Sequence, residues 1–122
     1  MDAEPVVRGY LAAWNERDAD ERLRLLERAC APGVRYVDPE VEATGVEELS
    51  RVIEDFQAGY PGHALRLDTG VDAHHDVVRF AWLVKRHDGT TLARGMDACI
   101  RSAEGRLTLV VGFFGPLGAT DA

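Results

Sequence analysis

The sequence predicts an α+β domain in which three helices cover a curved, mainly antiparallel sheet. The first half of the chain shows three stripes of hydrophobic residues with helical spacing, and the second half shows four β-rich runs separated by tight turns. Helices followed by strands are typical of this fold class. With 122 residues, of which 46% are hydrophobic and 29% charged, residues 1–122 have the size and composition of one globular domain.

Two helices are predicted at the start of the chain. In residues 4–16, hydrophobic side chains recur at i, i+3, i+4 and i+7, and this stripe places Tyr10 and Trp14 on the buried face. Asp18, with a glutamate three residues later, resembles a capping box that opens a second helix. Pro32-Gly33 is expected to end that helix, because this pair does not continue helical geometry easily.

A short strand and a third helix follow. Residues 34–38 alternate weakly and are followed by a proline, which predicts a strand that enters a loop over residues 39–43. Thr44, again with a glutamate three residues later, is predicted to cap the third helix. Its apolar stripe includes Phe56, and it is expected to end at Pro61-Gly62.

Four strands are predicted in the second half of the chain. They are residues 63–72, 77–87, 91–102 and 106–114, separated by His74-His75-Asp76, Asp88-Gly89 and Glu104-Gly105. Asp-Gly and Glu-Gly between such runs favour hairpin turns. The last run is apolar on both of its faces, so we expect helices to cover one face and a second copy of the chain to cover the other. This predicts a homodimer through the outer face of the sheet.

Composition narrows the classes of partner and site. A formal net charge of -7 argues against nucleic acid as a partner, because phosphate has the same sign. No apolar run approaches the roughly 20 residues of a membrane-spanning helix, so no membrane partner is expected. Cys30 and Cys99 lack the spacing of a metal motif, and no metal site is predicted. The first residues lack the pattern of a secretory signal, which favours the cytoplasm.

Three polar residues occupy positions where the pattern expects apolar ones. Tyr10 lies in the inner stripe of the first helix, Asp38 ends the short strand, and Asp97 lies in the middle of a strand. A buried, unpaired carboxylate is costly, so Asp97 requires a partner or a proton. If the helices cover the concave face of the sheet, all three side chains can point into one cavity.

The order of elements and several short motifs resemble the ketosteroid isomerase and SnoaL-like polyketide cyclase superfamily, also called the nuclear transport factor 2-like superfamily. The motifs are Gly-Tyr10-Leu-Ala-Ala-Trp-Asn-Glu-Arg-Asp, Val-Asp38-Pro, and Gly-Met-Asp97-Ala-Cys-Ile followed by Glu-Gly-Arg. The resemblance implies a cone-shaped, cystatin-like architecture. It also implies that Asp38 is a general base, that Tyr10 donates a hydrogen bond to an oxyanion, and that a protonated Asp97 is the second donor.

The function that follows from this resemblance is proton transfer on a small hydrophobic carbonyl compound, without a cofactor. The alternative is a domain of the same fold that binds such a molecule and does not convert it. Each residue also has a structural interpretation: Tyr10 as a core aromatic, Asp38 as the start of a turn, and Asp97 as the partner of Arg79 or Arg101. The sequence does not identify the substrate.

Aromatic residues complete the predicted binding site. Trp14, Phe56, Phe80 and Trp82 are predicted to bind the substrate, because an aromatic wall suits a flat apolar ligand, although Phe80 and Trp82 also fit a plain core. His74 and His75 lie next to a turn and are assigned no role. Arg79 is likewise assigned none.

Overall fold

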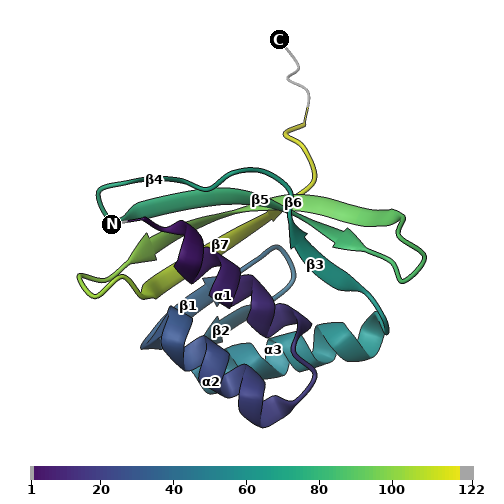
Figure 1. Ribbon diagram of the computed structural model, residues 1–122, viewed down its shortest axis with the longest axis horizontal. Coiled ribbons are helices and arrows are strands. Elements are labelled where there is room, and N and C mark those ends of the chain that lie inside the picture. The colour runs from purple at the N-terminus through teal and green to yellow at the C-terminus, as the bar shows by residue number, and fades with distance from the viewer. Residues whose placement is uncertain (1, 119–122) are drawn as a thin grey trace.

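The computed structural model describes residues 2–118, and it confirms the predicted α+β fold. The helices are α1 (Glu4–Asn15), α2 (Ala19–Ala29) and α3 (Val46–Gly59). The strands are β1 (Cys30–Val37), β2 (Glu42–Thr44), β3 (Ala64–Leu67), β4 (Asp72–His74), β5 (Val77–Lys85), β6 (Thr91–Arg101) and β7 (Leu107–Phe114). All three helices lie on one side of the curved sheet, and the buried residues of the core fill the space between them (Figure 1).

The strands form one mixed sheet in the order β2-β1-β7-β6-β5-β3. Strand β4 pairs with the first residues of β5, whereas β3 pairs with its last residues. Every neighbouring pair is antiparallel except β1 and β7, which run parallel. Strands β3, β5, β6 and β7 are antiparallel neighbours in chain order, as expected for the four predicted strands, and Asp97 lies in β6.

Two of the predicted boundaries are wrong at the start of β1. Helix α2 ends at Ala29, so Pro32-Gly33 lies inside the strand that begins at Cys30. The pairing with β7 shifts register between Cys30 and Arg35, and this irregularity accommodates the proline because no ladder hydrogen bond is required of it there. The predicted loop 39–43 also turns back sooner than expected, since Glu42–Thr44 pairs with β1 as β2.

The two predicted capping boxes have different outcomes. Asp18 caps α2 as predicted, because its side chain accepts a hydrogen bond from the Glu21 N–H at 2.9 Å. Thr44 is not the cap of α3: the residue at that position is Gly45, whose φ of 87° favours glycine. The glutamate that accepts a hydrogen bond from the Thr44 N–H is Glu48, and not Glu47, which the predicted box contained.

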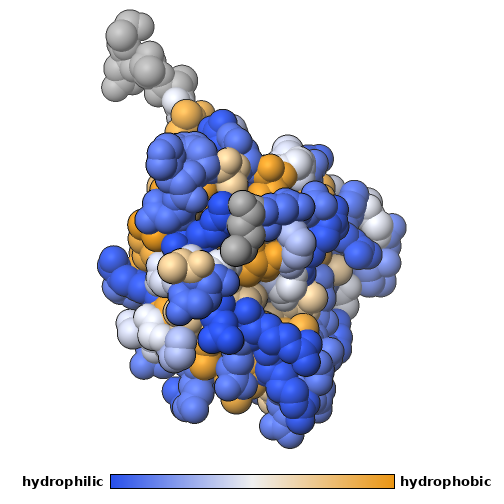
Figure 2. Space-filling model, turned by 60° about the vertical axis from the view of Figure 1, so that its left-hand side comes forward, coloured by the Kyte–Doolittle hydropathy of each residue, from blue (hydrophilic) through white to orange (hydrophobic). Residues whose placement is uncertain are grey.

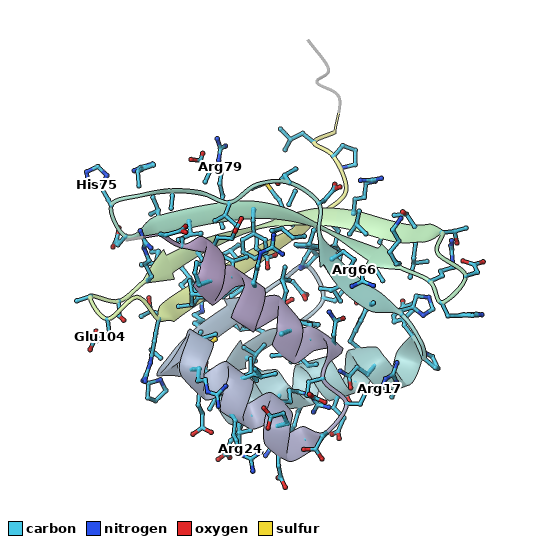
Figure 3. The ribbon with its side chains drawn as sticks, in the orientation of Figure 1. Arg17, Arg24, Arg66, His75, Arg79 and Glu104 are labelled. Carbon is cyan, nitrogen blue, oxygen red and sulfur yellow. The ribbon has the colours of Figure 1, made fainter. Side chains whose placement is uncertain are left out.

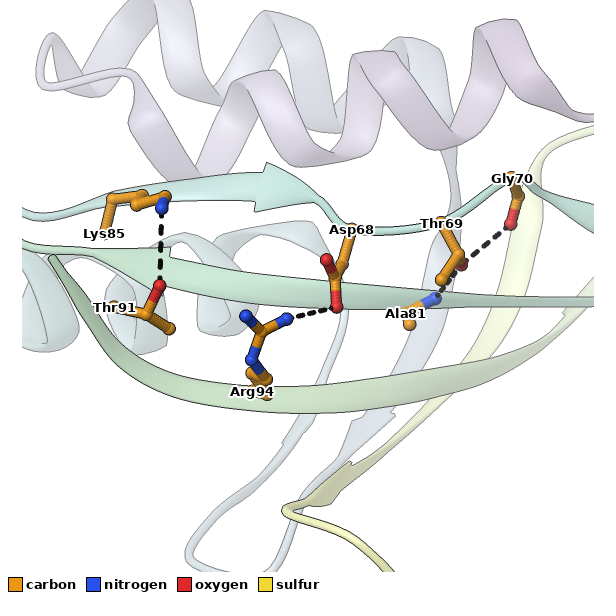
Figure 4. Close-up of polar contacts among 7 residues, drawn as sticks. All are labelled: Asp68, Thr69, Gly70, Ala81, Lys85, Thr91 and Arg94. Atoms are coloured by element: carbon orange, nitrogen blue, oxygen red, sulfur yellow. Dashed lines mark hydrogen bonds and ion pairs between the residues drawn. The ribbon is translucent and has the colours of Figure 1, made fainter. Parts of the chain in front are cut away.

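The predicted strand 63–72 is wrong after Leu67, where β3 ends; the next strand, β4, begins at Asp72 and includes His74, which was predicted in the turn. The chain leaves β5 after β3, and the Thr69 hydroxyl accepts a hydrogen bond from the Ala81 N–H in place of a backbone carbonyl (Figure 4). The same hydroxyl donates to the Gly70 carbonyl, which holds the chain in this excursion. The pairing then resumes as β4.

Helix α2 buries a residue that its apolar stripe did not predict. Arg22 is 2% exposed and lies on the buried face of α2 together with Leu26 and Ala29. Leu23 is only half-buried. The Arg22 guanidinium donates to the carbonyls of Glu16 and Arg17 after the end of α1. These contacts attach the α1–α2 connection to the rest of the domain.

The end of α1 is held by two further side chains. The Gln57 amide of α3 donates to the Trp14 carbonyl at 3.0 Å and to the Glu16 carbonyl at 2.9 Å. Asn15 pairs with the backbone of Leu65 in β3 through both its oxygen and its nitrogen, at 2.8 and 2.9 Å. Because Gln57 of α3 holds the Trp14 carbonyl and Asn15 holds β3, the position of Trp14 relative to α3 and the sheet is fixed.

The surface carries both polar and apolar side chains. On the face shown in Figure 2, hydrophobic residues form small patches that hydrophilic residues separate. On β6 and β7, Ile100 is 37% exposed and Phe113 is 53% exposed. Within residues 2–118, no helix has the length and apolar character that crossing a membrane requires.

Candidate active site

A cavity of about 610 Å³ lies between the helices and the concave face of the sheet. Six of the seven predicted site residues line it: Tyr10, Trp14, Asp38, Phe56, Trp82 and Asp97. Phe80 was predicted to bind the substrate and does not line this cavity; it packs in the core cluster at another position along the same face of β5. Val41 and Tyr60 also line the cavity and are 39% and 46% exposed, so it reaches the protein surface.

Asp97 is held by Trp82. The residue is 6% exposed, and its Oδ1 accepts a hydrogen bond from the Trp82 Nε1–H at 2.9 Å. Burial raises the pKa of Asp97 to about 7, while the indole hydrogen bond opposes this rise and the negative charge of Asp38 adds to it. A carboxyl of this kind is present in both protonation states near neutral pH.

The alternative in which Asp97 pairs with Arg79 or Arg101 is not found in the described part of the chain, since Trp82 is the hydrogen-bond partner of Asp97. Arg79 points away from the helices, on the opposite face of the sheet, and forms an ion pair with Asp72 at 2.9 Å (Figure 3). Arg101 donates to the carbonyl of His75 at 3.4 Å. The strand register explains the first result, because Arg79 and Phe80 are consecutive and therefore face opposite sides.

Tyr10 and Trp14 bring two hydrogen-bond donors to the helical side of the cavity. They lie one turn apart on α1, and their ring centroids are 6.5 Å apart. Neither the Tyr10 hydroxyl nor the Trp14 indole N–H has a partner at full hydrogen-bond geometry among residues 2–118. Burial, and after it the charge of Asp97, raises the pKa of Tyr10 well above its usual value, so its hydroxyl keeps its proton, although the nearby Trp14 N–H acts to lower that pKa. Unpaired buried donors are costly, and a ligand oxygen would satisfy them.

Asp38 is engaged by three donors. Its Oδ1 accepts from the backbone N–H groups of Glu40 and Val41 at 2.8 and 2.9 Å, and its Oδ2 accepts from the Tyr36 hydroxyl at 2.5 Å. These backbone contacts are those of a turn that begins at an aspartate. These three donors take most of the acceptor positions of the carboxylate and leave one on Oδ2, where a substrate proton could bind.

Tyr36 is a site residue that the sequence analysis missed. It is 5% exposed, lines the cavity, and contacts Trp14 with ring centroids 5.8 Å apart. Burial raises its pKa, and the hydrogen bond and the charge of Asp38 add to this, so it stays a protonated donor. The signal was available, since residues two apart on a strand face the same side, and Tyr36 therefore shares the face of Asp38.

Two glycines provide the space in which these groups meet. A Cβ at Gly112 would lie 3.1 Å from Asp97 Oδ1, 3.4 Å from Asp38 Cβ and 3.9 Å from the Tyr36 hydroxyl. The carboxyl of Asp97 and the Asp38–Tyr36 pair therefore converge over this one position of β7. The other glycine, Gly95, lies beneath Trp82.

Charges at the rim of the cavity are predominantly acidic. Glu40 and Asp55 line it and are exposed. Arg94 also lines it, but its guanidinium is paired with Asp68 at 2.7 Å (Figure 4). The site thus offers acids and neutral donors rather than an unpaired cation.

The histidines and cysteines do not add a metal centre. His74 and His75 contact one another at the exposed end of β4, with Nδ1 atoms 2.9 Å apart, and neither lines the cavity. Cys30 and Cys99 are buried free thiols. Across the described residues, no three His, Cys, Asp or Glu side chains gather in a way that could hold a metal ion.

Searches against known proteins support this fold. A crystal structure from Agrobacterium tumefaciens, described as a candidate isomerase of the SnoaL-like family, is 36% identical and has a TM-score of 0.87 over 92% of this chain and 96% of that one. An NTF2-like protein of unknown function from Exiguobacterium is 14% identical, with a TM-score of 0.72 over 92% and 99% of the two chains. A SnoaL-like protein of unknown function from Burkholderia thailandensis is 15% identical, with a TM-score of 0.71 over 93% and 95%.

An open curved sheet, three covering helices and a cavity between them define an NTF2-like protein. No protein-family model matches the sequence, and neither does any curated protein. The identity and coverage of the Agrobacterium structure are nevertheless sufficient for assignment: the chain belongs to the SnoaL-like family. This confirms the resemblance found in the sequence.

Proposed function

We propose that this protein is a cofactor-free isomerase or cyclase that transfers a proton on a small, hydrophobic carbonyl compound of steroid or polyketide type. The observation that supports this most strongly is Asp97, a buried carboxyl on the cavity wall whose pKa is about 7. An acid–base group is most effective when its pKa lies near the working pH. The description of the Agrobacterium relative as a candidate isomerase agrees with this proposal.

The reaction would use the groups on the two walls of the cavity. Ionised Asp97 accepts a proton from the carbon next to the carbonyl, and the electron pair of the broken C–H bond moves to the carbonyl oxygen. Tyr10 stabilises the resulting enolate by donating a hydrogen bond to it. Returning the proton to another carbon gives an isomer. Attack of the enolate carbon on a second carbonyl instead closes a ring and moves the electron pair of that carbonyl to its oxygen, which then takes the proton back from Asp97. Neither path requires a metal or an organic cofactor.

Asp38 is the base that the family resemblance implies, and it is the second candidate for that role after Asp97. The contacts of Asp38 with Tyr36, Glu40 and Val41 favour a holding function, because they occupy both of its oxygens. Asp97 has one hydrogen bond from the described residues, at Oδ1. Asp97 is therefore the first choice for the group that moves the proton.

The proposal is tested by incubating the protein with a panel of β,γ-unsaturated steroidal and aromatic ketones. Formation of the conjugated enone is measured by its ultraviolet absorbance. We expect turnover by the parent and a loss of about 100-fold or more in Asp97→Asn, because general acid–base catalysis contributes about that much. Tyr10→Phe should also lower kcat. Asp38→Asn should cost less than Asp97→Asn if Asp38 mainly holds Tyr36.

The result also separates catalysis from binding. If the parent protein binds these ketones and converts none of them, it is a ligand-binding domain, which is the alternative function. Full activity in Asp97→Asn would instead refute the role of that residue, and a complete loss confined to Asp38→Asn would return the base to Asp38.

We also propose a homodimer through the outer face of β6 and β7, formed with a second copy of the chain. Ile100 and Phe113 are exposed there, and burying such side chains against a symmetry-related copy removes apolar surface from water. Sedimentation velocity at tens of micromolar should show a dimer, and Phe113→Glu should shift it to monomer. Glu104→Lys, at the exposed β6–β7 turn, serves as the control; a monomeric parent would contradict the proposal.

A further inference from the structure

Trp82 lines the cavity as an aromatic side chain and also donates a hydrogen bond to Asp97. Its ring lies on the cavity wall and is 8% exposed, yet its one polar atom, Nε1, points to Oδ1 of Asp97 at 2.9 Å. The two residues come from neighbouring strands, since β5 carries Trp82 and β6 carries Asp97. This hydrogen bond is buried, where it is not weakened by competition with water.

The orientation of the Trp82 ring is determined by its neighbours. Gly95 is directly opposite Trp82 in the β5–β6 register, and a Cβ there would lie 2.3 Å from Trp82 Cζ2 and 2.6 Å from Cη2. The six-membered part of the indole therefore lies over the bare backbone of Gly95. Phe114 packs against the ring edge-to-face, with centroids 5.9 Å apart and an interplanar angle of 83°. Only glycine at position 95 allows this placement, and the placement aims Nε1 at Asp97.

The same geometry distinguishes the two oxygens of Asp97. Oδ1 accepts the indole hydrogen bond and lies 3.1 Å from the Cβ position of Gly112, against the sheet. Oδ2 accepts no hydrogen bond from residues 2–118. Two chemically equivalent oxygens thus have different surroundings.

We propose that Trp82 is a positioning residue whose indole N–H, oriented by Gly95, holds Oδ1 of Asp97 and leaves Oδ2 as the oxygen that gains and loses the proton. The effect on catalysis rests on the proposed function. The hydrogen bond and its effect on Asp97 do not, so they can be measured in the ligand-free protein.

The groups around Asp97 determine what removal of the indole would do. Tyr10 of α1, Tyr36 of β1 and Cys99 of β6 face it, and burial raises the pKa of each of them above its usual value, so they stay neutral. Asp38 is the charged neighbour that raises the pKa of Asp97. Arg94, on the same strand, is paired with Asp68. Trp82 is thus the neighbour that favours the ionised form of Asp97.

Nuclear magnetic resonance of the ligand-free protein tests this proposal. The chain has two tryptophans, so its indole N–H resonances are those of Trp82 and Trp14. We expect the Trp82 resonance to titrate with the same midpoint as the Asp97 carboxyl carbon, and to stop doing so in Asp97→Asn. The Trp14 resonance is the internal control and should move less. A Trp82 resonance that does not follow Asp97 would overturn the proposal.

Substitution provides a second measurement. Trp82→Phe keeps an aromatic ring and removes the N–H, so the pKa of Asp97 should rise by about 1, since a hydrogen bond to the charged form lowers it. Trp14→Phe, the same change elsewhere on the cavity wall, should leave that pKa unchanged. Equal effects of the two substitutions would refute a specific role for Trp82. If the parent converts a ketone, the lower limb of its pH–kcat profile should move upward in Trp82→Phe alone; titration as expected without turnover would refute the enzyme and leave the positioning role intact.

Discussion

Asp97→Asn is expected to make the protein more stable at pH 8 than the parent. Burial raises the pKa of Asp97 from the ordinary 3.8 to about 7. Below pH 3.8, both the folded and the unfolded chain hold this proton, so the group has no effect. Between pH 3.8 and 7, the unfolded chain releases the proton while the native state keeps it, and the free energy of unfolding of the parent falls. Above pH 7, both states are ionised and the loss is complete.

The size of this effect follows from the same pKa. Each pKa unit is worth about 1.4 kcal/mol, so the rise to about 7 corresponds to a penalty of at most about 4 kcal/mol at pH 8. Asparagine removes the penalty and keeps an oxygen that can accept from the Trp82 N–H. Chemical denaturation of parent and variant from pH 4 to pH 8 measures it. The difference between them should grow up to about pH 7 and then remain constant.

Asp97→Ala separates the charge from the hydrogen bond. It also removes the titrating group, so its stability relative to the parent should show the same pH dependence. The whole curve should lie lower than that of Asp97→Asn, because the buried Trp82 N–H loses its acceptor. If the free energies of unfolding of the parent and Asp97→Asn differ by the same amount at pH 4 and pH 8, burial does not destabilise the ionised form of Asp97. The combination expected here, higher stability with lower activity, is common where a site holds a strained or desolvated group.

The sequence predicted those features of the site that depend on local pattern. Tyr10 follows from a helical stripe, and Asp97 follows from its place in a strand between two hairpin turns. Both reach the same cavity because the helices pack against the concave face of the sheet. These positions required only the periodicity of each element and the order of the elements.

The features that were missed depend on contacts between distant elements. The bond from Trp82 to Asp97 needs the β5–β6 register, and it also needs Gly95 beneath the ring. The turn contacts that engage Asp38 depend on the path of the chain after β1, which the predicted loop did not specify. Phe80 has the same strand parity as Trp82 and still does not line the cavity, because parity determines the face of a residue and not its position along that face.

Arg22 shows how tertiary contacts override a local pattern. Arginine side chains are usually exposed, so the sequence alone predicts an exposed Arg22, yet this residue is 2% exposed. Its acceptors are all neutral: the carbonyls of Glu16, Arg17 and Ser50 and the side chains of Ser50 and Gln57. A planar guanidinium with five N–H groups can reach these separate acceptors at once, which an ammonium group cannot.

Arg22→Met is therefore expected to destabilise the protein by at least about 3 kcal/mol, since hydrogen bonds from a charged group contribute about 1.5 to 3 kcal/mol each. A buried ion pair can be replaced by apolar residues on both sides, but the acceptors of Arg22 include backbone carbonyls that no substitution removes. Arg22→Lys should also lose stability, though less. Arg24→Met on the same helix is the matched control: its ion pair with Glu21 is exposed, so a change of no more than about 0.5 kcal/mol is expected. Thermal unfolding of the three variants measures these effects, and equal losses in Arg22→Met and Arg24→Met would show that the buried guanidinium does not hold α1, α2 and α3 together.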